Sequence, residues 1–109
     1  MGYLISLPWL IIKYSRAQKK FKHAVNFGVE GNLCRENIEL FKQKIKDHIA
    51  DLPTGYIEGT YRKKTTALHF YNETNNLNVV FNVTNAEFIT AWELGPNQVK
   101  DLKKNKNIT

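Results

Sequence analysis

The sequence predicts an α+β fold in which N-terminal helices pack on a four-stranded antiparallel β-meander, and two patterns carry this prediction. Before Gly55, apolar residues recur every three or four positions, which is the spacing of an amphipathic helix. After Gly55, short segments rich in β-branched and aromatic residues alternate in polarity, which is typical of strands. The 109 residues suffice for one domain with a modest core and leave no room for a cofactor domain plus a substrate domain.

Two helices are expected in the first half of the chain. The first covers residues 16–25 and is capped by Ser15. Asn26-Phe27-Gly28 is its expected exit, because glycine tolerates a positive φ. Its apolar stripe consists of Ala17, Phe21, Ala24 and Val25. The second helix ends at Pro53, and its stripe consists of Ile38, Phe41, Ile45, Ile49 and Leu52. This second helix is the natural cover for the buried face of the sheet.

The strands are expected at residues 56–62, 66–71, 77–83 and 88–94, with connections short enough for hairpins. Side chains alternate along a strand, so the last strand has two different faces. Phe88, Thr90, Trp92 and Leu94 are expected on one face, and Ile89 and Ala91 on the other. A final helical turn is expected over residues 96–102.

Composition divides the chain into three segments. Residues 1–12 form an apolar lead segment, residues 13–102 the single domain, and residues 103–109 a basic tail that we expect to be solvated. The lead segment is shorter than the roughly 20 residues of a membrane-spanning helix. We expect it to pack on the domain, or to be the end of a longer parent chain, and we expect no stable membrane insertion.

The charge of the chain predicts a polyanionic partner. There are 16 Lys and Arg residues against 10 Asp and Glu, a net charge of +6. The single cysteine, Cys34, excludes an intramolecular disulfide and any zinc cluster built from cysteines, and the three histidines are scattered. We therefore expect no metal and no cofactor.

Lys20, Lys22 and His23 form the clearest candidate for chemistry. Lys20 and His23 are three residues apart on a helix and point the same way. Neighbouring ammonium groups disfavour the cationic imidazole, so His23 can act as a base near neutral pH, while the lysines hold a phosphate. Cleavage of RNA without a metal needs such a base, phosphate cations and a proton donor for the leaving 5′-oxygen.

The last strand supplies a second feature, Thr90 beside Trp92, which could hydrogen-bond a phosphate and stack on a base. Each feature also has a structural interpretation: His23 as an ordinary polar residue of a basic helix, and Trp92 as a core aromatic. His48 borders the apolar stripe of its helix. His69 faces away from Leu68 and Phe70 and could join a cleft.

Three motifs together resemble the C-terminal nuclease domain of colicin D and related bacterial toxins. They are Lys19-Lys20-Phe21-Lys22-His23-Ala24 followed by Asn26-Phe27-Gly28, then Gly59-Thr60-Tyr61-Arg62, and finally Phe88-Ile89-Thr90-Ala91-Trp92-Glu93-Leu94. The resemblance covers about residues 19–96. It implies a compact ribonuclease of the barnase–colicin–RelE-like type that cuts a tRNA anticodon loop without a metal and leaves a 2′,3′-cyclic phosphate.

The resemblance also implies roles for single residues. His23 would be the acid/base residue, with Lys20 and Lys22 as phosphate cations. Thr90 and Trp92 would correspond to the Ser-x-Trp of the family, where threonine keeps the hydroxyl and adds a methyl. Lys19 and the cluster Arg62, Lys63 and Lys64 are expected to contact RNA. Either one residue serves as both acid and base, or a lysine supplies the second function.

The expected partners are tRNA and a cognate acidic immunity protein, with the toxin monomeric or bound one-to-one to that protein. Such a toxin would leave the producing bacterium and act in the cytoplasm of a target cell. Two alternatives remain: a non-catalytic RNA-binding module, and a protein-interaction domain whose basic face serves only an acidic protein.

Overall fold

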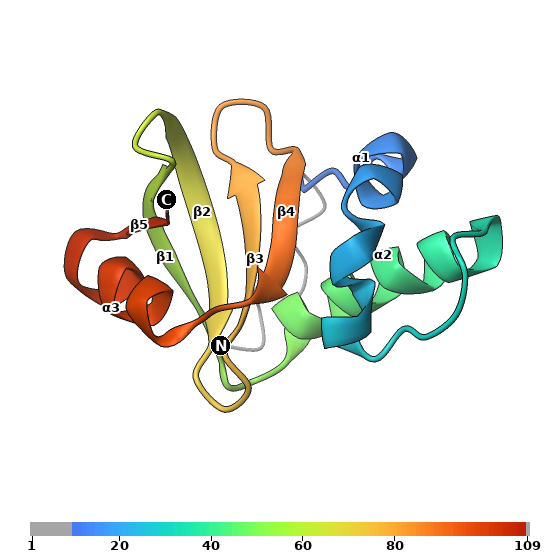
Figure 1. Ribbon diagram of the computed structural model, residues 1–109. Coiled ribbons are helices and arrows are strands. Elements are labelled where there is room, and N and C mark those ends of the chain that lie inside the picture. Colours follow the sequence, from blue (N-terminus) through green and yellow to red (C-terminus); the bar gives the residue numbers. More distant parts are fainter. Residues whose placement is uncertain (1–9, 109) are drawn as a thin grey trace.

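The computed structural model describes residues 10–108 and has helices on both sides of a curved β-sheet (Figure 1). The N-terminal part contains α1 (Tyr14–Lys19), the 3-10 helix η2 (Phe21–Phe27) and α2 (Arg35–Ala50). The strands β1 (Thr54–Tyr61), β2 (Thr65–Asn72), β3 (Leu77–Asn82) and β4 (Phe88–Glu93) follow. The chain then forms α3 (Pro96–Asn105) and β5 (Asn107–Ile108). The predicted α+β class is confirmed.

The sheet differs from the predicted four-stranded meander, because it has five strands in the order β4-β3-β2-β1-β5. The first four strands pair in antiparallel fashion, as expected. Strand β5 pairs in parallel with β1 and makes the sheet mixed. The prediction of a solvated basic tail over residues 103–109 agrees with the exposure of residues 103–106 and is wrong for residues 107 and 108. Residues 103–105 complete α3, and Asn107 and Ile108 are buried.

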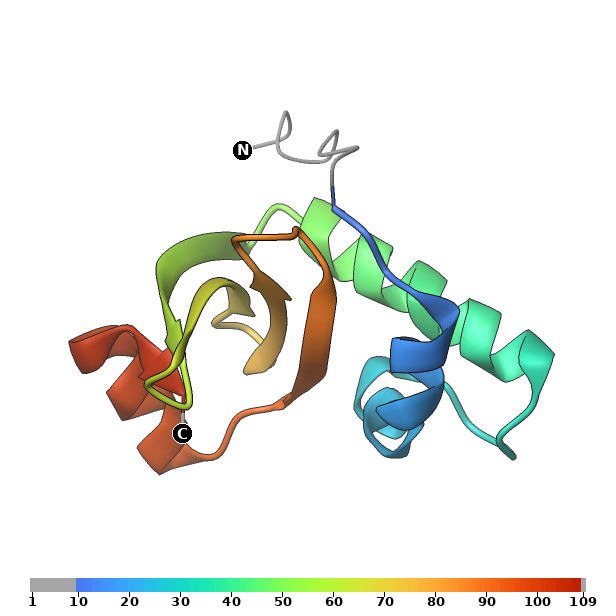
Figure 2. The ribbon, with the colours of Figure 1, turned by 90° about the horizontal axis from the view of Figure 1, so that it is seen from above.

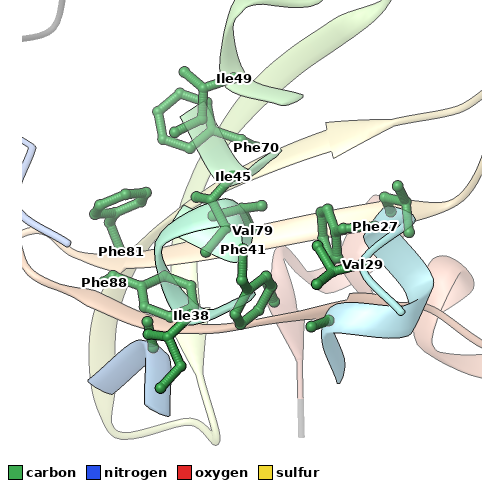
Figure 3. Close-up of a cluster of buried hydrophobic side chains, with 14 residues drawn as sticks. Phe27, Val29, Ile38, Phe41, Ile45, Ile49, Phe70, Val79, Phe81 and Phe88 are labelled. Atoms are coloured by element: carbon green, nitrogen blue, oxygen red, sulfur yellow. The ribbon is translucent and has the colours of Figure 1, made fainter. Parts of the chain in front are cut away.

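One face of the sheet packs on the N-terminal helices and forms the larger core (Figure 3). Phe41 of α2 lies at its centre and contacts Phe88 of β4 and Phe27 of η2 edge-on or tilted, with ring centroids 6.4 and 5.9 Å apart. The stripe predicted for α2 is confirmed at Ile38, Phe41, Ile45 and Ile49. Leu52 was wrongly placed in it, because the backbone leaves the helix at Asp51 and Leu52 is 73% exposed.

The other face of the sheet is covered by α3, which the sequence predicted only as a short helical turn. Leu102 of α3 is fully buried against Tyr71, Leu94 and Ile108. Ile57, Tyr61, Trp92 and Val99 pack around this second, smaller core. Helices therefore cover both faces of the sheet.

Seen from above, the sheet curls strongly (Figure 2). As a result, the ends of β1 and β4 approach each other, although β2 and β3 lie between them in the sheet order. The rings of Tyr61 at the end of β1 and Trp92 of β4 are 6.4 Å apart between centroids. This curl creates the hollow described below.

The predicted first helix is two elements, because the chain changes from α to 3-10 geometry at Lys20. Its cap is Lys13 and Ser15 lies inside α1, so the predicted cap is wrong. In a 3-10 helix every third residue lies on one line. Phe21, Ala24 and Phe27 accordingly face the core, whereas Val25 is 62% exposed and does not belong to the stripe. The exit at Gly28 is confirmed by its φ of 83°.

Most of the apolar lead segment, residues 1–9, lies outside the described residues. Ile11 forms a parallel bridge with Glu87, and Leu10 and Ile12 pack against the larger core. Among the residues that the structure describes, no helix combines the length and the apolarity needed to cross a membrane.

Candidate active site

A cleft of about 190 Å³ lies where η2, β4, the end of β1 and α3 meet. It is lined by Lys20, Lys22, His23, Tyr61, Arg62, Thr90, Trp92 and Gln98. All five residues predicted to carry the chemistry are among them, together with one of the four residues expected to contact RNA. The histidine and the tryptophan are close, since their ring centroids are 6.3 Å apart.

The 3-10 geometry of η2 aligns Lys20 with His23. Lys20 precedes η2 with φ −99° and ψ 11°, and its carbonyl accepts the hydrogen bond of the His23 amide at 3.0 Å. Because side chains at i and i+3 are eclipsed in a 3-10 helix, both groups point to the same side. Lys22 lies on the next row, which is more exposed, and reaches the cleft from its rim.

A β-bulge in β4 places Thr90 and Trp92 in the cleft. Val80 pairs with Thr90, but Phe81 pairs with Phe88, so Ile89 is an extra residue in β4. The bulge interrupts the alternation of side chains. Phe88 therefore joins Ala91 in the larger core, and the expectation that Phe88 shares a face with Thr90 and Trp92 is wrong. Thr90 is only 2% exposed and lines the floor of the cleft.

A row of flat groups runs along the cleft from His23 through Trp92 and Tyr61 to Arg62. The Arg62 guanidinium lies over the Tyr61 ring, 5.2 Å from its centroid, in a cation–π arrangement. The indole Nε1–H of Trp92 donates to Oε1 of Gln98 at 3.2 Å, and the Gly95 amide donates to the same oxygen at 3.0 Å. Gln98 of α3 thus fixes the orientation of the indole.

Burial, together with the positive charge of the cleft, lowers the pKa of two of its groups. Partial burial is the main cause that lowers the pKa of His23 below its usual 6.5, and Lys22 and Lys20 lower it further. The pKa of Lys20 is also lowered, first by burial and then by Arg16, Arg62, Lys22 and Lys19. The arrangement therefore offers a neutral imidazole, cations for phosphate oxygens and rings on which a base can stack.

The structure separates the other residues expected to contact RNA from this cleft. Arg62 lines it, whereas Lys19, Lys63 and Lys64 are exposed outside its lining. Tyr61 belongs to one of the three motifs and was interpreted as a possible RNA contact, whereas Gln98 was missed. The segment from Gly95 to Gln98 does contain a signal for Gln98, since glutamine at the third helical position commonly bonds back to the N-cap amide.

The remaining two histidines lie away from the cleft. His48 is buried and its Nε2–H donates to the Phe70 carbonyl at 2.7 Å. His69 is fully buried, donates from Nε2 to the Thr60 carbonyl at 2.9 Å and accepts at Nδ1 from the Asn78 amide. The idea that His69 joins a cleft is therefore wrong. Within residues 10–108, no three side chains of His, Cys, Asp or Glu gather in a way that could hold a metal.

Known proteins similar to this chain agree in sequence and in fold. The family model for colicin D matches residues 16–102. Colicin-D of Escherichia coli is 36% identical over 87 residues, which are 77% of this chain and 12% of that protein. The chain thus spans a small part of that relative. A solved structure, a ribonuclease from Escherichia coli complexed with its inhibitor protein, is 25% identical with a TM-score of 0.74, over 84% of this chain and 99% of that one.

Proposed function

The chain belongs to the colicin D family, and from this premise we propose that its cleft is the active site of a metal-independent toxin ribonuclease that cuts tRNA in the anticodon loop. One observation carries the proposal: His23 lies beside Trp92 in a single cleft with three cationic side chains. A base, phosphate ligands and a stacking surface are the groups that transesterification of RNA requires.

His23 begins the reaction as the general base. Its neutral imidazole takes the proton of a ribose 2′-hydroxyl, and the 2′-oxygen attacks the adjacent phosphorus. The new P–O2′ bond forms as the P–O5′ bond breaks, which leaves a 2′,3′-cyclic phosphate and a 5′-hydroxyl end. The lowered pKa of His23 supports this role, because the imidazole is neutral at pH 7.

Lys20 and Lys22 bind the non-bridging oxygens, which carry most negative charge in the transition state. Arg62 binds the same phosphate equally well in the bound substrate and in the transition state, so it contributes to substrate binding. The hydroxyl of Thr90 adds a neutral donor at the cleft floor. The leaving 5′-oxygen takes a proton from either Lys20 or protonated His23. We favour Lys20, since its lowered pKa makes its ammonium a stronger acid than an ordinary lysine.

The shape of the cleft supports a single-stranded loop as substrate. A volume of about 190 Å³ is small for a duplex and suits one nucleotide turned out of its stack. Trp92 and Tyr61 offer rings for bases, and stacking on such rings contributes about 1–3 kcal/mol per base. Lys19, Lys63 and Lys64 lie outside the cleft and would contact the flanking phosphates.

An acidic immunity protein is the second partner that we propose. The net charge of +6 favours any acidic surface that imitates the RNA phosphates. The similar ribonuclease was solved with an inhibitor protein, which supports a partner of this kind. We propose a one-to-one complex with a toxin that is otherwise monomeric. The domain would be delivered from the producing bacterium and would act in the cytoplasm of the target cell.

The test is cleavage of total tRNA in the presence of EDTA. We expect fragments with 2′,3′-cyclic phosphate ends that map to anticodon loops when both ends are sequenced. His23→Ala should reduce cleavage at least 1000-fold while the circular dichroism spectrum stays unchanged. The matched control is Gln43→Ala, which alters an exposed residue of α2 outside the cleft and should retain full activity.

Three outcomes would contradict the proposal. Full activity of His23→Ala would remove the catalytic assignment. Salt-dependent tRNA binding without strand scission at any enzyme concentration would indicate an RNA-binding module. Failure of tRNA to compete with an acidic protein partner would indicate a protein-interaction domain.

A further inference from the structure

The turn between β1 and β2 carries Arg62 into the cleft in an unfavourable backbone conformation. Arg62 and Lys63 have φ values of 55° and 58°, in the left-handed region. Turns of this kind normally contain glycine or asparagine, because a side chain with a Cβ is strained there. Such a conformation persists only where the surrounding structure fixes it.

Residues 106–108, which include β5, are the structure that fixes this turn. Asn107 of β5 is 4% exposed, and its Oδ1 accepts hydrogen bonds from the Thr60 hydroxyl at 2.8 Å and the Lys63 amide at 3.0 Å. The backbone adds further bonds on both sides of the turn: Thr60 N–H donates to the Lys106 carbonyl, and Arg62 N–H to the Ile108 carbonyl. Strand β5 and the residue before it thus hold the strained turn in place.

The Asn107 side chain is itself oriented by α3. Its Nδ2 donates to Oδ2 of Asp101 at 3.2 Å, which places Oδ1 toward the turn. Gly59 lets β1 and the residue that precedes β5 approach closely, because a Cβ at this position would collide with the Lys106 carbonyl oxygen. The contacts therefore form a continuous path from α3 through Asn107 to the turn.

Arg62 contributes to the cleft only in this orientation. Its guanidinium lies over Tyr61, whose ring contacts Trp92, and its charge lowers the pKa of Lys20. A change of φ at Arg62 or Lys63 would turn the guanidinium away from Tyr61 and from Lys20. The family model ends at residue 102, so β5 lies beyond the matched segment.

We propose that Asn107 is a positioning residue for substrate binding: it holds the strained β1–β2 turn so that Arg62 faces the scissile phosphate. The inference rests on the proposed ribonuclease function. It assigns a role in RNA binding to β5, whose residues have no base, acid or phosphate ligand of their own in the cleft.

The experiment compares Asn107→Ala with Asn82→Ala. Asn82 performs the same task at the β3–β4 turn, where its Oδ1 accepts from the Thr84 amide at 2.8 Å, and that turn supplies no residue to the cleft. We expect Asn107→Ala to raise KM for tRNA about tenfold with kcat nearly unchanged, and Asn82→Ala to leave KM unchanged. Adding Asn107→Ala to Arg62→Ala should raise KM no further, because the lost interaction is the same.

Two further measurements separate the role of Asn107 from a failure of the variant to fold. If Asn107→Ala does not fold, Thr60→Val removes one bond to Asn107 and should raise KM about threefold in a folded protein. Amide hydrogen exchange at Lys63 should accelerate in Asn107→Ala and not in Asn82→Ala, whether or not the protein cleaves RNA. An inactive wild type would overturn the proposed function, while equal KM values or additive effects with Arg62→Ala would overturn the role of Asn107.

Discussion

The protonation state of His23 should determine how activity falls in acid. Burial, Lys22 and Lys20 lower its pKa below 6.5, and a base works only when neutral. We therefore expect kcat/KM to stay constant as the pH falls through 6.5 and to decline only at the lower pKa. A pH profile in EDTA-containing buffers, with an NMR titration of the His23 ring, measures this.

Replacing Lys22 by glutamine should move the pH at which kcat/KM declines toward 6.5, because one of the two charges that lower the pKa of His23 is removed. Lys19→Gln is the matched control, since the charge of Lys19 acts on Lys20. A decline centred above pH 6.5 in the wild type, or one that Lys22→Gln does not move, would contradict the assignment of His23 as the base.

Local spacing was enough to find the residues that lie on one short element. Lys20, Lys22 and His23 lie within four consecutive positions, and Thr90 and Trp92 are two apart in one strand. Tyr61 and Gln98 reach the same cleft from β1 and α3. Their contribution depends on the curl of the sheet and on the packing of α3, which no local pattern contains.

At the scale of elements, the contact between β1 and β5 should be sensitive to a single methyl group. Gly59→Ala places a Cβ against the Lys106 carbonyl, and backbone must shift to relieve the overlap. We expect a loss of about 1–3 kcal/mol in the free energy of unfolding, measured by urea denaturation. Strand β5 should separate from β1 in this variant.

Gly55→Ala is the matched control for this prediction, because it lies in the same strand and its Cβ would meet no atom within 4 Å. It should change the free energy of unfolding by less than about 0.5 kcal/mol. Equal stability of the two variants would show that β5 does not pack closely on β1.

The types of most elements were predictable, but their irregularities were not. The stripe of α2 has a spacing that only a helix satisfies, and four residues of it are buried. By contrast, α and 3-10 geometry fit the apolar pattern of residues 16–27 almost equally well. Only packing selects the 3-10 period that leaves Val25 exposed, and only pairing with β3 reveals the bulge at Ile89.

The whole molecule combines two cores on opposite faces of one sheet, and the cleft lies at the edge of the smaller core. The sequence indicated one covered face, because α2 has the longer and clearer stripe. The second cover, α3, carries a single fully buried residue, Leu102, among many polar ones. Strand β5 is two residues long, so its pairing with β1 leaves no periodic signal at all.

Burial of His48 and His69 should make the whole fold sensitive to acid. Burial is the main cause that lowers both pKa values below 6.5, and it outweighs the hydrogen bonds to Phe70 and Thr60 that raise them. A histidine in the unfolded chain keeps a pKa of about 6.5. Below this pH the unfolded state therefore binds more protons than the folded state, and stability falls as the pH falls toward the folded pKa values.

Urea denaturation between pH 7.5 and pH 5 measures this effect. Stability should be constant above about pH 7.5 and should fall below pH 6.5 by up to about 1.4 kcal/mol per pH unit for each buried histidine. His69→Gln should flatten the slope, even if it lowers stability at pH 7.5, because one titrating group is removed. His23→Gln should change the slope less, since His23 is only half-buried and solvent screens its charge. Stability that stays flat or rises toward pH 5 would mean that these two imidazoles accept protons inside the fold, in conflict with the burial that lowers their pKa values.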